Sequence, residues 1–361
     1  MEIVKTIETT AKQKLIKKLV CELINKEKSE LISEELEKIE VFSHYTSISK
    51  LFYILESDSF WLSGLRFSND SSEENLFGDD WIKSNKYKSD NFVLCGSNNE
   101  DILSQWRGYC PNGGASITLD LFEIHKYHVL HPNFKDNDVE NYMGIDALGI
   151  PVLYGEIESS YKPIKDGSKG VQSIAKEIQE ILGKDDTYKS LTINDFVPYI
   201  KHKDFSEEQE TRLLFSNSNG ELSEYVRFRP LKNGTKVPYI VIKNGYIKDS
   251  DKTKEGTSRK NIEKIWKNQK SRRKVIIPYC SNQRNIHSLM RKYIGSKFQK
   301  VRIYCEGHLP IRKITIAPMP DQNRIKEQVK RFCDSKYWLE DVEVTVSNTP
   351  YVFSINNLAL D

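Results

Sequence analysis

Short apolar segments with strand character and amphipathic helical segments follow each other along this chain of 361 residues without a regular strand–helix–strand alternation. A doubly wound parallel sheet requires that alternation, because each parallel strand is reached through a crossover helix. The irregular order therefore predicts an α+β fold with mixed, mostly antiparallel sheets flanked by helices. A chain of this length also has enough residues to bury a large core.

Runs of apolar and β-branched residues bounded by polar turns mark the expected strands. They lie at residues 41–46, 60–63, 91–97, 115–120, 151–157, 205–215, 224–230, 237–242, 311–321 and 342–353. Apolar residues spaced by three and four mark the expected helices. These lie at residues 1–40, from near Ser47 through Leu55, at the start of residues 101–120, and at residues 168–184 and 322–336, and a further helical stretch ends near Pro198. Composition divides the chain into an N-terminal helical extension (1–40), an α+β core domain (41–244 and 306–361) and a basic, mainly helical insertion (245–305).

Charge is distributed unevenly, although the net charge is only +3. Residues 225–313 contain 24 Lys and Arg against 5 Asp and Glu, which leaves the rest of the chain at −16. The basic side chains that we single out there are Lys267, Lys270, Arg272, Arg273 and Lys274. Such a stretch binds phosphate backbones without sequence preference, which predicts a nucleic-acid contact. A solvated basic helix, or one docked on the acidic body of a second copy, accounts for the same composition.

Six scattered cysteines and the absence of a long apolar run restrict the environment of the chain. No C-x-x-C pair is present, so we expect free thiols in a reducing cytoplasm and no metal site built on cysteine. His125, His128 and His131 have a spacing that fits no common zinc signature, and a surface loop is favoured for them. No membrane helix or secretory signal is expected from the sequence.

The segment "FSEEQETRLLF", residues 205–215, concentrates charge at the start of an apolar run. If it is a strand, Glu208, Glu210 and Arg212 share one face, because side chains alternate with period two. Two carboxylates and a guanidinium in a row indicate a site. A charged strand edge explains the same pattern without any function.

Two further motifs combine chemistry-bearing residues with an ordinary alternative. In "RFSND", the side chains of Arg66, Ser68, Asn69 and Asp70 offer contacts for an anion and for ribose hydroxyls, although an Asn-Asp turn has the same composition. In "LSQWRGY", an aromatic side chain can stack on a planar ring. A helix whose aromatic residues are buried in the core has the same pattern.

Taken in order, these motifs resemble the bacterial domain-of-unknown-function 2971 family over roughly residues 41–353. The motifs are "HYTS", "RFSND", "LSQWRGY…GGASITLD", an E-x-E-x-R segment, "PIRKITIAPMPD" and a terminal S-x-x-P-Y. Two departures concern the ends of the resemblance. Val352 stands where the family usually has arginine, and residues 1–40 and 245–305 look like additions. The family name assigns no activity.

The "HYT" strand, its following helix and the "L-x-S-x-x-L" segment are more distantly similar to the His-x-Thr opening of ADP-ribosyltransferases. That similarity implies an ADP-ribosyltransferase-like core with NAD as substrate and no metal. It implies that His44 binds the ribose and that Thr46 lies beside the nicotinamide, with Tyr45 of the same motif as a further binding residue. It also implies that an aromatic side chain from a later segment, Tyr109 or Trp106, stacks on the nicotinamide ring.

The same similarity gives the late carboxylates their roles. Glu210 would hold the ribose 2′-hydroxyl and stabilise the developing oxocarbenium ion. Glu208 would orient the acceptor or act as its general base. Arg212 would keep the pair ionised or hold a phosphate, and Arg66 would meet the pyrophosphate.

Three functions are therefore open from the sequence. The first is an NAD-consuming ADP-ribosyltransferase or NAD glycohydrolase, acting as a bacterial toxin or anti-phage effector, with a nucleic acid, a protein or a second copy as partner. The second is a nucleic-acid-binding protein or metal-independent nuclease that uses residues 225–313. The third is a non-catalytic binding or sensor module.

Overall fold

The computed structural model describes most of the chain. The described residues are 2–27, 41–67, 91–120, 125–133, 142–156, 170–217, 220–231, 234–244, 274–277, 283–295, 301–305 and 307–350. Several predicted site residues lie outside them, namely Ser68, Asn69, Asp70, Lys267, Lys270, Arg272 and Arg273. Arg66 and Lys274 are described in backbone only.

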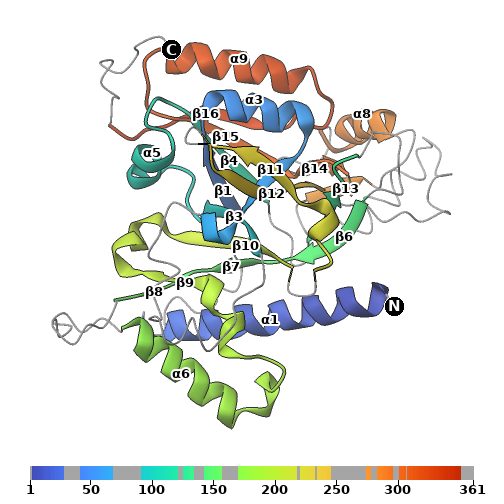
Figure 1. Ribbon diagram of the computed structural model, residues 1–361. Helices are drawn as coiled ribbons and strands as arrows, with labels where there is room; N and C mark the ends of the chain where they lie inside the picture. The colour runs from blue at the N-terminus through green and yellow to red at the C-terminus, as the bar shows by residue number, and fades with distance from the viewer. Residues whose placement is uncertain are drawn as a thin grey trace.

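Twelve strands of the described chain form one sheet, in which neighbouring strands are antiparallel except at the β15–β16 pair (Figure 1). They are β1 (Val41–Thr46), β2 (Phe60–Gly64), β3 (Asn91–Ser97), β4 (Ala115–Asp120), β5 (His125–Leu130), β6 (Tyr142–Ala147), β7 (Gly149–Pro151), β10 (Glu210–Ser216), β11 (Arg227–Pro230), β12 (Lys236–Asn244), β15 (Ile311–Ile316) and β16 (Glu343–Val346). Two short strands, β8 (Leu153–Gly155) and β9 (Ile200–His202), pair in parallel beside this sheet. The predicted α+β fold is confirmed.

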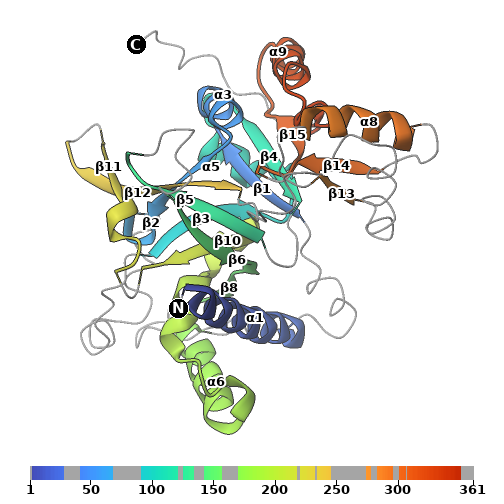
Figure 2. The ribbon, with the colours of Figure 1, turned by 90° about the vertical axis from the view of Figure 1, so that its right-hand side faces the viewer.

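Helices cover the sheet from two sides (Figures 1 and 2). On one side lie α3 (Ile48–Ser57) and α9 (Gln322–Asp334), where Phe52 and Phe332 meet edge to face with ring centroids 5.7 Å apart. On the other side lie α1 (Glu2–Glu27) and α6 (Val171–Lys184). The short α5 (Leu103–Tyr109) lies beside β1.

Helix α1 is anchored to the sheet by a buried glutamine. The Gln13 amide accepts a hydrogen bond from the Leu148 backbone N–H at 3.0 Å and donates one to the Leu214 carbonyl at 3.4 Å. Ile16, Leu19 and other apolar residues of α1 pack in the same core cluster as α6. The helix predicted at the N-terminus therefore packs on the α+β core over its described part.

A separate lobe holds the described part of residues 245–305. Strands β13 (Lys274–Ile277) and β14 (Arg302–Cys305) pair in parallel, and α8 (Gln283–Gly295) connects them, so the lobe is a β–α–β unit. The sequence predicted mainly helix here. The two strands were missed because each contributes only four residues between basic segments.

A chain of polar side chains ties this lobe to the core. His308 Nδ1 lies 2.8 Å from Asp58 Oδ2, and His308 Nε2 lies 3.1 Å from the Tyr337 hydroxyl. Tyr337 in turn donates to Gln283 Oε1 at 3.2 Å, at the start of α8. The His308 ring stacks on Trp338 with centroids 4.2 Å apart. These contacts join α3, the lobe and the turn that follows α9.

Two local predictions are wrong. Residues Lys203–Glu208 form a 3₁₀ helix, and Gln209 has a left-handed backbone with φ of 46°, so the strand begins only at Glu210. The histidines at 125 and 128 lie in β5 and not in a surface loop, and His128 is buried. Both errors come from tertiary packing that a local pattern does not report.

Candidate active-site cleft

The sheet opens at β3, because β1 and β2 pair with different parts of the same edge of this strand. On that edge, β2 pairs with Val93 and Phe92, and β1 pairs only with Ser97, while β10 takes the opposite edge along its full length. The Cys95 carbonyl, between these two contacts, accepts a hydrogen bond from His44 Nδ1 at 3.0 Å. A side chain thus satisfies a backbone group that no strand pairs.

A cleft of about 620 Å³ lies at this fork. Its lining brings together the predicted residues His44, Tyr45, Thr46, Tyr109, Glu208 and Glu210. Four of the exposed large apolar side chains of the described chain also line it, namely Tyr53, Trp61, Phe67 and Tyr109. A pocket of this size with aromatic walls and a few polar groups is typical of small-molecule sites.

A buried network of charges forms one end of the cleft. Arg212 donates from Nε to Glu210 Oε1 at 2.7 Å and from Nη2 to Glu210 Oε2 at 3.0 Å. Lys201 of β9 donates to Glu210 Oε2 at 3.1 Å and to Glu208 Oε2 at 2.7 Å. Two carboxylates and two cations balance here. Glu210 and Arg212 share a strand face, whereas the 3₁₀ turn, and not strand alternation, brings Glu208 to them.

The environment pushes the pKa values of the two carboxylates apart. Burial alone would raise the pKa of Glu210, but the charge and hydrogen bonds of Arg212, with Lys201, lower it to about 2. For Glu208, burial outweighs the Lys201 hydrogen bond and raises the pKa above its ordinary value. The Glu208 side chain is 14% exposed against 3% for Glu210, and it has no described partner at Oε1. Such separated pairs are typical of acid–base sites.

His44 and Tyr109 present uncharged polar groups. Burial lowers the pKa of His44 in spite of its hydrogen bond to Cys95, which favours the neutral ring. Because Nδ1–H donates to a carbonyl, Nε2 is then a hydrogen-bond acceptor. Burial, with the nearby Glu208, raises the pKa of Tyr109, so its phenol keeps its proton. Its ring is exposed in the cleft and available for stacking.

Burial corrects two predicted ligand contacts, those of Trp106 and Tyr45. Trp106 is 0% exposed, packs edge to face on Tyr45 and donates from Nε1 to Asp101 at 2.7 Å, so its ring cannot stack on a ligand. The Tyr45 hydroxyl is also occupied, because it donates to the Asn99 carbonyl and accepts from the Ile102 N–H. These aromatic residues are part of the core.

Arg212 is likewise no phosphate ligand. Its guanidinium is buried, with Nη1 donating to the Pro198 carbonyl at 2.7 Å in addition to the two bonds to Glu210. Its role is to keep Glu210 ionised. The Glu210 N–H donates to the Tyr154 hydroxyl at 2.8 Å, which fixes the start of β10.

Gly114 and the terminal S-x-x-P-Y motif have structural roles. A Cβ at Gly114 would clash with the Thr46 carbonyl oxygen and lie 2.5 Å from Cys110 Sγ, so only glycine lets β4 approach β1 beside the cleft. Ser347 and Thr349 both donate to Asp101 Oδ1, which holds the segment after β16 against the start of α5.

The lining of the cleft also contains cations that the sequence did not single out. Arg229 donates from Nη2 to Ser63 at 2.8 Å, while its buried Nε has no hydrogen-bond partner among the described residues. Lys50 is exposed in the same lining. Trp61 stacks on Tyr239 with centroids 4.7 Å apart. Strand alternation in "FWLSG" does place Trp61 on the outward face, but no local signal identifies Lys201, Lys50 or Arg229.

Within the part of the chain that the structure describes, no group of three or more His, Cys, Asp and Glu side chains could hold a metal ion. None of the described cysteines forms a disulfide bond. None of the described helices combines the length and apolar character needed to span a bilayer.

Comparison with known proteins finds a family resemblance for one segment of the chain and no activity. Neither the curated proteins nor the solved structures contain a significant match, and an ADP-ribosyltransferase relationship is not confirmed. Residues 105–213 match the family model described as "Protein of unknown function (DUF2971)". This matched segment runs from α5 to Leu213 and includes Tyr109, Glu208, Glu210 and Arg212. The predicted resemblance to the domain-of-unknown-function 2971 family is therefore confirmed over this segment of the chain.

Proposed function

We propose that the cleft binds NAD and breaks the bond between nicotinamide and ribose. The observation that carries this proposal is the pair of carboxylates with opposite pKa shifts, at the end of a cleft with aromatic walls. Breaking the bond leaves positive charge on the ribose, while the bonding electrons leave with neutral nicotinamide. The ionised Glu210 provides fixed negative charge where that positive charge develops.

Glu208 is the carboxylate that meets the second reactant. Its Oε1 has no described partner, and its raised pKa brings it closer to the pH at which it exchanges a proton. It takes a proton from the attacking water or acceptor hydroxyl, whose oxygen forms the new bond to the ribose carbon. The products are nicotinamide and either ADP-ribose or an ADP-ribosylated acceptor.

The rest of the cleft supplies binding groups for a dinucleotide. His44 accepts a ribose hydroxyl at Nε2, and the exposed ring of Tyr109 stacks on nicotinamide. Arg229 and Lys50 give charge for the pyrophosphate, and Trp61 offers a second stacking surface. An enzyme of this kind would deplete NAD or modify a macromolecule, which fits a bacterial toxin or an anti-phage effector.

The proposal is tested by incubating the purified full-length protein with NAD and measuring free nicotinamide by chromatography. We expect nicotinamide to accumulate in proportion to protein, and NAD to raise the melting temperature. A wild-type protein that neither releases nicotinamide nor gains thermal stability from NAD would overturn the proposal. The non-catalytic binding module would then be favoured.

A further inference from the structure

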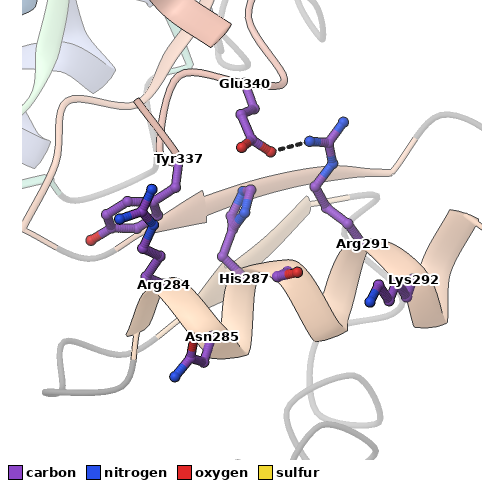
Figure 3. Close-up of a pocket in the computed structure, with 8 residues that line it drawn as sticks. Arg284, Asn285, His287, Arg291, Lys292, Tyr337 and Glu340 are labelled. Atoms are coloured by element: carbon purple, nitrogen blue, oxygen red, sulfur yellow. Dashed lines mark hydrogen bonds and ion pairs between the residues drawn. The ribbon is translucent and has the colours of Figure 1, made fainter. Parts of the chain in front are cut away.

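A second hollow lies on the β–α–β lobe, between α8 and the turn that follows α9 (Figure 3). It measures about 530 Å³, and its lining includes Arg284, Arg291 and Lys292 of α8 with Glu340 opposite them. The apolar face of α8 is buried against β13 and β14 through Ile286, Met290 and Ile294. The polar face is therefore held in a fixed orientation by the core of the lobe.

The cations of this hollow differ in their partners. Arg291 is paired with Glu340 (Figure 3). Its Nε also lies 3.2 Å from Asp341 Oδ1. Arg284 and Lys292 are exposed and form no ion pair with a described residue. Ser288 lies between them at helical spacing, so all three share one face of α8.

His287 supplies an independent sign of a missing partner. Its side chain is 2% exposed, yet Nε2 has no hydrogen-bond partner among the described residues, and the nearest carboxylate oxygen, of Asp341, lies 3.8 Å away. The ring projects from α8 into the hollow toward Glu340 (Figure 3). A buried ring nitrogen left in this way is a position for a ligand or water to fill.

We infer that this face of α8 binds the phosphodiester backbone of a nucleic acid. Eight residues separate Arg284 from Lys292, which is about 12 Å along a helix, so one phosphate cannot contact both cations. A nucleic-acid strand advances about 3.4 Å per nucleotide, so three or four nucleotides bridge them. The surrounding stretch, residues 225–313, has 24 basic against 5 acidic side chains, which attracts such a polyanion. This inference does not depend on NAD cleavage.

The test is fluorescence anisotropy with a labelled single-stranded 20-nucleotide DNA, measured without NAD over a series of salt concentrations. The variant Arg284→Gln/Lys292→Gln removes the two cations of the hollow that form no ion pair with a described residue. We expect its affinity to fall about tenfold or more and the salt slope to decrease by about 1.4, because each phosphate contact on a single strand contributes about 0.7.

The matched control is Lys176→Gln/Lys184→Gln on α6, which removes two exposed charges with the same eight-residue spacing. We expect this control to bind like the wild type, and thermal melts to show that all three proteins are folded. Unchanged affinity and salt slope in the α8 variant, an equal loss in the α6 control, or no DNA binding by the wild type would overturn the inference. Complete competition by millimolar ATP would also overturn it, since that would indicate a mononucleotide site.

Discussion

An Arg–Glu ion pair lies at the cleft and another at the α8 hollow. The two pairs differ in how deeply their side chains are buried. Arg212 and Glu210 have side chains 2% and 3% exposed, and a second cation, Lys201, completes their charge balance. Arg291 and Glu340 are 43% and 34% exposed, and Arg284 and Lys292 line the same hollow. A buried pair cannot lose one partner without leaving an uncompensated charge, whereas water screens an exposed pair. In our proposals, the first pair belongs to a site for developing positive charge, and the second lies at the edge of a surface that binds an anionic backbone.

The largest loss of folding stability is expected where the buried Arg212–Glu210 pair is broken. Replacing Arg212→Ala removes one of the two cations that pair with Glu210, together with the bond to the Pro198 carbonyl. We expect a loss of about 3–5 kcal/mol in the free energy of unfolding, measured by urea denaturation. Replacing the nearby exposed Glu207→Ala should change the free energy of unfolding by less than about 0.5 kcal/mol. A loss below 1 kcal/mol for Arg212→Ala would show that the pair is not buried as described.

The dependence of the free energy of unfolding on pH in the acid range should report the charge of Glu210 in the same pair. The pKa of Glu210 is lowered from 4.5 to about 2 in the folded protein, so its stabilisation is complete above pH 4.5 and is lost as the pH falls toward 2. The full contribution is roughly 3 kcal/mol. The raised pKa of Glu208 acts in the opposite sense, because its contribution weakens as the pH rises.

Urea denaturation at pH 5, 4 and 3 tests this dependence. The stability of the wild type should fall more steeply than that of Glu210→Gln, which lacks the titrating group. Parallel curves would contradict the lowered pKa of Glu210.

A smaller effect is expected at the joint between the lobe and the core. Asp58→Asn keeps a residue that tolerates the left-handed backbone at φ of 50° but removes the charge that meets His308. We expect a loss of about 1.5–3 kcal/mol, as for a hydrogen bond to a charged group. Hydrogen exchange should show faster opening of α8 in this variant, and unchanged exchange in α8 would show that the network does not hold the lobe.

The smallest loss of folding stability is expected at the exposed Arg291–Glu340 pair. Arg291→Ala should lower the free energy of unfolding by no more than about 1 kcal/mol, because the pair with Glu340 is largely solvated. The difference between this variant and Arg212→Ala measures what burial adds. Equal losses in the two variants would remove the distinction between the two regions.

The sequence predicted the fold class because strand alternation and helical periodicity are local properties, as in β1, α3 and α9. It also singled out Glu208 and Glu210, since their spacing suggested a shared face. The reason was wrong for Glu208, because this residue does not lie in the strand. It ends a 3₁₀ helix that is followed by the left-handed Gln209, and strand alternation does not predict that turn. Trp106 was assigned to the ligand because its type does not reveal burial. Lys201 and Arg229 were missed because only the tertiary fold brings β9 and β11 beside the cleft.

The most direct test of the cleft is the rate of nicotinamide release per folded molecule in two neighbouring variants, Glu208→Gln and Glu207→Gln. Both exchange one carboxylate for an amide in the same 3₁₀ turn, but only Glu208 lines the cleft. We predict a loss of about a hundredfold or more for Glu208→Gln and a rate within about twofold of wild type for Glu207→Gln. Full activity in Glu208→Gln, or an equal loss in Glu207→Gln, would contradict a catalytic role for this cleft.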